Sequence, residues 1–198
     1  MKKRIMAAFL LTIVLLSNIS LAYGMTEQST NRPIYEYTVT EAERNIEFER
    51  QKQRIMDEIA SIEPTGEYDY IYEHDYGSKK EVTISGFLAN QPSGGTQFPT
   101  GGGFYVSTSG GASYSISVAF PKPYDMVSVS ADIGYVTDSG VYIAAPNKTG
   151  YFKAYGEKDF EIQPLIVWRI HRFTGERSIY YRTTLQTHLR SRYYAKSV

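Results

Sequence analysis

The chain has 198 residues, of which 42% are hydrophobic, and it carries 21 basic and 21 acidic residues. This length suits one domain with a substantial core and is too short for two domains of ordinary size. The balanced charge disfavours a nucleic-acid-binding protein. The absence of cysteine excludes a fold that depends on disulfides.

Residues 1–24 have the pattern of a secretory signal peptide. Three basic residues at positions 2–4 precede an apolar run at 5–16, and small residues follow that run. Cleavage near Ala22 or Gly24 satisfies the preference of signal peptidase for small residues. An uncleaved membrane anchor is the alternative, but the polar residues after the run make it the weaker one. We therefore expect a secreted, extracellular protein whose processed chain has 18 basic residues against 21 acidic ones, since three bases are removed.

Residues 25–39 are expected to form a flexible leader, and residues 40–64 an amphipathic helix. Thr40 and Glu43 fit a capping box, in which each side chain accepts a hydrogen bond from the backbone N–H of the other residue. Pro64 ends the helical pattern. The apolar stripe is too short for an independent coiled coil, so we expect the helix to cover a face or edge of the following domain. A helical spacer or self-association arm is the alternative.

Residues 65–198 are predicted to form an antiparallel β-domain, because tyrosine, glycine, serine and β-branched residues dominate the sequence there. The predicted fold class is mostly β, with an antiparallel β-sandwich preferred to a closed barrel and one N-terminal α-helix. Two hairpins are expected, at 114–135 and at 165–185. A three-residue turn at 174–176 in the second hairpin would avoid placing Arg172 opposite Arg177.

The 114–135 hairpin alternates polar and apolar residues in both arms, which gives a pleated strand one apolar face. In a soluble sandwich that face belongs to the core. The alternative is a secreted toxin or antimicrobial protein whose hairpin enters a target membrane. The residues that would then face lipid are Ile116, Val118, Phe120, Val127, Val129 and Ile133.

Four tyrosines near the start of the β-domain are candidates for contact with a ligand. They alternate with acidic residues, and the amphipathic tyrosine ring is suited to stacking on glycans. The candidates are Tyr68, Tyr70, Tyr72 and Tyr76. The intervening acids would alternate faces in an extended segment, so a calcium site is disfavoured.

Charge is distributed unevenly along the chain. From Arg169 onward seven basic residues stand against Glu176 alone, whereas residues 25–81 hold fourteen acids and seven bases. Either these two segments pack against each other, or the basic segment meets an anionic partner such as a cell-wall glycan or an anionic surface polymer.

No sequence motif identifies a catalytic residue, a cofactor-binding residue or a metal ligand, and no cofactor is expected. The serine-rich strands are similar to those of small secreted proteins of Gram-positive bacteria, a resemblance that implies no named family or activity. We therefore expect a non-catalytic extracellular binding or surface-interaction module. The membrane-inserting toxin is the first alternative. A cell-wall or polysaccharide hydrolase is the second, because glycoside-cleaving carboxylates leave no local signature.

Overall fold

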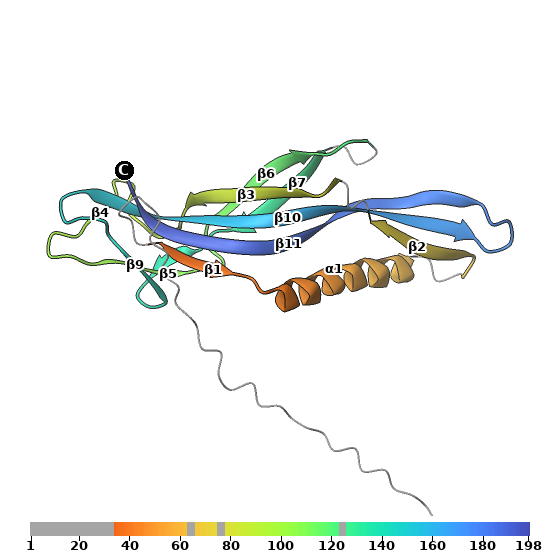
Figure 1. Ribbon diagram of the computed structural model, residues 1–198, viewed down its shortest axis with the longest axis horizontal. Helices are drawn as coiled ribbons and strands as arrows, with labels where there is room; N and C mark the ends of the chain where they lie inside the picture. The colour runs from red at the N-terminus through yellow and green to blue at the C-terminus, as the bar shows by residue number, and fades with distance from the viewer. Residues whose placement is uncertain (1–33, 63–65, 75–77, 123–125) are drawn as a thin grey trace, which may run out of the picture.

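Two strands of 21 residues run along almost the whole molecule and form its long axis (Figure 1). They are β10, Tyr151–His171, and β11, Arg177–Ser197, and they pair antiparallel along their length. The computed structural model describes residues 34–62, 66–74, 78–122 and 126–198. The predicted signal peptide therefore lies outside the described residues.

Short strands flank this central ribbon and complete a large antiparallel sheet. On one side, β1, Tyr35–Thr38, pairs with β11. On the other side three strands pair with β10. They are β2, Tyr68–His74; β3, Lys80–Phe87; and β4, Thr96–Gln97. β2 and β3 follow one another along the same edge of β10, and the ladder is interrupted opposite Gln163 and Pro164, where the proline offers no N–H to a ladder.

Two smaller sheets cover one face of the large sheet. The first has the order β8-β5-β9, and the second is the hairpin β6-β7. Their bounds are β5, Gly103–Ser107; β6, Ser113–Ala119; β7, Met126–Asp132; β8, Tyr135–Thr137; and β9, Val141–Ala144. The expected mostly-β, antiparallel fold with one helix is thus confirmed.

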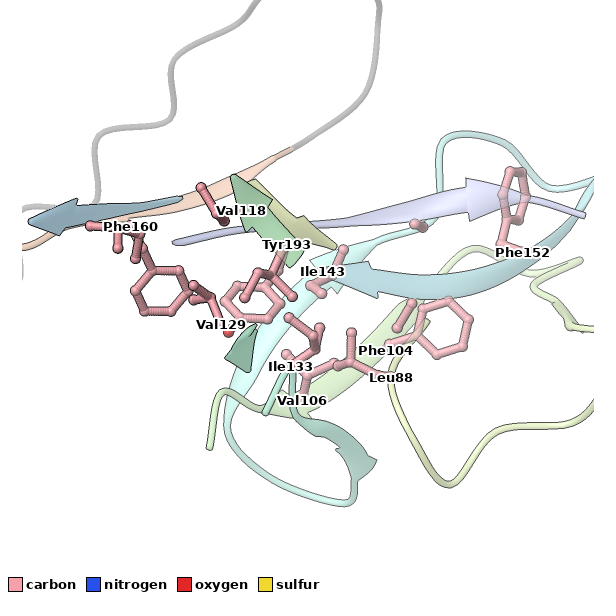
Figure 2. Close-up of a cluster of buried hydrophobic side chains, with 14 of the residues drawn as sticks. Leu88, Phe104, Val106, Val118, Val129, Ile133, Ile143, Phe152, Phe160 and Tyr193 are labelled. Carbon is pink, nitrogen blue, oxygen red and sulfur yellow. The ribbon is translucent and has the colours of Figure 1, made fainter. Parts of the chain in front are cut away.

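The hydrophobic core lies between these layers (Figure 2). Val118, Val129 and Ile133 from the second layer meet Phe160 and Tyr193 from the ribbon. Ile133 and Tyr193 are fully buried. Complete burial of each such side chain contributes about 1.5–3 kcal/mol, so the core is the main stabilising feature of this part of the molecule.

Helix α1, Glu41–Ile62, lies along β11, as Figure 1 shows. The capping box forms as predicted: the N–H of Thr40 donates to Glu43 Oε2 at 2.9 Å, and the N–H of Glu43 donates to Thr40 Oγ1 at 3.3 Å. Further along, the side-chain amide of Gln51 bonds both the N–H and the C=O of Gln186. This amide occupies the exposed edge of β11 beyond β1 and thereby satisfies backbone groups that a neighbouring strand would otherwise bond.

No helix among the described residues is long and apolar enough to cross a membrane.

Three expectations about the chain path differ from the structure. Residues 35–38, expected in the flexible leader, form β1. The strand expected to begin at residue 165 begins at Tyr151 instead and runs without a break to His171. The three-residue turn at 174–176 was wrong, because the N–H of His171 donates to the C=O of Glu176 at 2.9 Å and closes a four-residue loop. In this register Arg177 pairs with Ile170, so Arg172 and Arg177 are not cross-strand partners and the repulsion that the expected turn was meant to avoid does not arise.

Two glycines allow the layers to approach closely. Gly86 and Gly156 face each other across β3 and β10 and are both buried. A Cβ at Gly86 would lie 2.2 Å from Cζ of Tyr114, whose hydroxyl donates to the C=O of Phe87 at 2.9 Å. A Cβ at Gly156 would lie 2.5 Å from Cγ2 of Ile133. Because these two residues have no side chains, Tyr114 and Ile133 of the second layer pack directly against the backbone of the sheet.

We expect Gly86→Ala to destabilise the protein by about 1–3 kcal/mol, because the tyrosine ring and the hairpin that carries it must move. Gly94→Ala is the matched control, since a Cβ there meets nothing within 4 Å. Urea denaturation followed by circular dichroism measures both. Equal midpoints for Gly86→Ala and the unmodified protein would show that the layers are not in contact at this glycine.

Candidate functional site

A hollow of about 320 Å³ opens where the two layers are joined, near the beginning of β10. Its walls come from the segment after β3 and from β4, β5 and β8. The lining residues are Asn90, Gln91, Pro92, Thr96, Phe98, Gly103, Phe104, Tyr105, Val136, Thr137 and Asp138. Concave sites with an apolar wall and a few polar groups are typical of ligand-binding sites.

The segment after β3 is held by both layers. The N–H of Ala89 donates to the C=O of Gly134 at 3.0 Å, which ties the segment to the second layer. The amide of Gln91 accepts from the N–H of Ala154 and donates to its C=O, which ties the segment to β10. Asn90 lies between these attachments with φ 58°, a left-handed conformation that asparagine tolerates better than most residues. Hydrogen bonds to backbone groups of both layers therefore fix this wall of the hollow.

Two tyrosines make an exposed aromatic surface at the hollow. Tyr105 on β5 and Tyr142 on β9 are cross-strand partners whose ring centroids are 5.2 Å apart. They are 46% and 47% exposed, respectively. Large aromatic side chains with so much free surface can stack on a planar or amphipathic ligand. Of these two residues Tyr105 lines the hollow, beside Thr137 and Asp138.

Of the four tyrosines predicted from the sequence, the three that the structure describes lie on β2, at the opposite end of the molecule from the hollow (Figure 1). Tyr68 and Tyr70 pair with the last residues of β10 and share one face of the ribbon. Tyr72 is described only through its backbone pairing with Val167, and Tyr76 lies outside the described residues. Tyr68 and Tyr70 therefore lie on one face of the ribbon tip, the end of the ribbon where β2 pairs with residues 165–171 of β10, and are separate from the hollow.

The hairpin residues proposed to face lipid line the core in this structure. The predicted pairing is present, with Ile116 opposite Val129 and Val118 opposite Val127. Val118, Phe120, Val129 and Ile133 are buried, while Ile116 and Val127 are partly buried against them. The hairpin's outward face carries serines, of which Ser115 and Ser130 share a hydrogen bond of 2.7 Å.

A buried polar cluster between the layers includes a serine beside a histidine. Ser191 Oγ lies 2.9 Å from His188 Nε2, a distance typical of a nucleophile and its base. Ser191 is only 4% exposed, and the His188 ring lies against Phe160. Burial and the charge of Lys158 lower the pKa of His188. The lowered pKa favours a neutral His188, which packs in the interior beside the cation of Lys158. The hydroxyl of Ser191 is too deeply buried to reach a polymeric substrate.

Asp159 is the buried carboxylate of the ribbon, at 8% exposure. It accepts from Thr83 Oγ1 at 2.7 Å, from Arg190 Nε at 2.9 Å and from Arg192 at 3.2 Å. Burial raises its pKa, but the hydrogen bonds from Thr83 and Arg190 and the charges of both arginines outweigh burial and leave the pKa below its ordinary value. This carboxylate joins β3, β10 and β11, and its acceptor sites are occupied.

The acidic and basic segments of the sequence meet in several ion pairs. Arg172 pairs with Asp69 at 2.9 Å, and Arg177 pairs with Glu73 at 2.9 Å. Acids of β2 therefore neutralise Arg172 and Arg177, while Arg190 and Arg192 pair with Asp159 on β10. Within the described ranges, no three histidine or acidic side chains come together as a metal site would require.

Comparison with known proteins found no matching family model, no matching curated protein and no matching solved structure.

Sequence reasoning missed Tyr105 and Tyr142 as site residues. Each lies in a short strand, and nothing in either segment alone indicates that its ring faces solvent. Only the register in which β5 pairs with β9 places the rings of Tyr105 and Tyr142 side by side.

We expect the stability of the protein to fall as the pH drops below about 6.5 because of His188. Its lowered pKa means that the folded state binds a proton less readily than the unfolded state, where histidine titrates near pH 6.5. The stabilising contribution is therefore present above about pH 6.5 and is lost as the pH falls through the folded-state pKa.

Urea midpoints measured across this range should fall less for His188→Gln than for the unmodified protein. An unchanged slope in His188→Gln would contradict a contribution of His188 to the pH dependence.

Proposed function

We propose that the protein is an extracellular, non-catalytic binding module that holds a saccharide in the hollow beside Tyr105 and Tyr142. The observation that carries this proposal is the exposed tyrosine pair next to a hollow with fixed walls. Residues 1–24 support an extracellular location through their signal-peptide pattern.

The lining of the hollow favours an uncharged saccharide. Asn90, Thr96 and Thr137 supply polar groups, and Phe98 and Tyr105 supply rings. No basic side chain is among the lining residues, so an anionic sugar would meet only the carboxylate of Asp138. A ring face for stacking and a few hydrogen-bonding groups for orientation together suit a neutral sugar of a cell-wall glycan.

Two features support binding without turnover or membrane insertion. Asp138 is the only carboxylate among the lining residues, whereas most glycoside hydrolases place two across the scissile bond. The apolar face of the 114–135 hairpin is occupied by the core, so insertion would first require the hairpin to leave the sheet. The hydrolase and the membrane-inserting toxin are therefore the less supported functions.

Removing one tyrosine ring should weaken saccharide binding without unfolding the protein. We expect Tyr142→Ala to lose about 10-fold in affinity, which corresponds to about 1.4 kcal/mol. Retention on insoluble chitin, cellulose and purified peptidoglycan identifies a bound polymer, and depletion isotherms on that polymer measure the affinity.

Tyr181→Ala is the matched control, because Tyr181 is 43% exposed and lies on β11 far from the hollow. The proposal predicts unchanged binding for this control. Failure of the unmodified protein to bind any of the three polymers, or equal binding by Tyr142→Ala, would contradict a saccharide site in the hollow.

A further inference from the structure

An arginine at the tip of the ribbon is held between two tyrosine rings. The Arg169 guanidinium carbon lies 5.0 Å from the ring centre of Tyr68 and 5.9 Å from that of Tyr180. Its Nε donates to Ser178 Oγ at 3.0 Å. Tyr180 is itself packed edge-on against Tyr70, with ring centroids 5.1 Å apart. Residues from β2, β10 and β11 thus fix the position of one guanidinium group.

Arg169 differs from the neighbouring arginines in its charge environment. Arg172 and Arg177 each pair with a carboxylate of β2. Within the part of the chain that the structure describes, Arg169 has no carboxylate partner, and its contacts are the two rings and Ser178. A half-buried cation held by rings and a hydroxyl keeps its positive charge uncompensated.

The two faces of the tip therefore carry different chemistry. Strand pairing places Asp69 opposite Ile170 and Glu73 opposite Ile166, on the face away from Arg169. Tyr68 and Tyr70 pair with His171 and Arg169 and lie on the same face as the guanidinium. On that face Glu67 contacts His171 at 3.2 Å. On the face away from Arg169, Arg172 and Arg177 are paired with carboxylates, whereas on the tyrosine face the guanidinium of Arg169 forms no ion pair with a described residue.

We propose that Arg169, flanked by Tyr68 and Tyr180, is a binding site for an oxyanion carried by a surface polymer. A guanidinium presents a planar set of donors that matches a carboxylate or a phosphate with two parallel hydrogen bonds. Its Nε is occupied by Ser178, so the terminal nitrogens are the donors for the ligand. Flanking rings hold the guanidinium plane through cation–π contacts and reduce the conformational freedom lost on binding. This site is independent of the hollow, which lies toward the other end of the ribbon.

The test titrates the full chain at physiological salt with two probes. Oligogalacturonate carries carboxylates, and an oligomer of glycerol phosphate carries phosphodiesters, so a preference between them identifies the source of the oxyanion. Calorimetry gives the affinity.

We expect Arg169→Gln to lose at least 10-fold in affinity for the preferred probe, and Arg169→Lys to lose most of that amount because lysine keeps the charge without the planar donors. Arg182→Gln is the matched control: it removes the same charge from an exposed residue on the opposite face, and should change affinity by less than about 3-fold. Circular dichroism verifies that each variant is folded.

Three results would overturn the proposal. The unmodified protein could bind neither probe at millimolar concentration. Arg169→Gln could bind as well as the unmodified protein. Alternatively, Arg169→Gln and Arg182→Gln could lose affinity equally, which would show a general attraction to positive charge. Saccharide binding at the hollow is tested separately, with Tyr142→Ala. Either proposed site can therefore be disproved without affecting the other.

Discussion

The close contact between Gly86 and Gly156 on the sheet and Tyr114 and Ile133 above it determines how the layers are assembled. Side chains at these two positions would hold the layers apart, because a Cβ would fall within 2.5 Å of the second layer. The fully buried Tyr193 lies beside the same area and completes the core. The close approach of the layers also brings the segment around Ala89 within hydrogen-bonding distance of both, and that segment forms a wall of the hollow.

The long ribbon gives the protein two ends with different surface chemistry. At one end, Tyr105 and Tyr142 stand beside uncharged polar groups and one carboxylate. At the other end, Arg169 stands between two aromatic rings without an ion pair to a described residue, whereas Arg172 and Arg177 are paired with carboxylates. A continuous pair of 21-residue strands connects them, with Asp159 and its arginines tying the middle of the ribbon to its neighbours. Such an arrangement is suited to contacting a wall or surface polymer at two separate points.

Features set by local sequence were predictable, and features set by register were not. The capping box at Thr40 and the hairpin around Val118 and Val129 follow from spacing of a few residues, and both are present. The continuity of β10 was missed because Gly156 and Pro164 resemble strand breaks, although tertiary packing accommodates them. The hollow was missed because its walls come from four separate segments.

The most direct test of this account is hydrogen–deuterium exchange of the full chain with and without fragments of the polysaccharide that retains it. Binding at the hollow predicts slower exchange confined to residues 90–105 and 135–142, with unchanged exchange in β6 and β7 because the hairpin stays packed on the sheet. Unchanged exchange around the hollow together with faster exchange in β6 and β7 would contradict the account. That result would instead favour a protein that acts by releasing its hairpin.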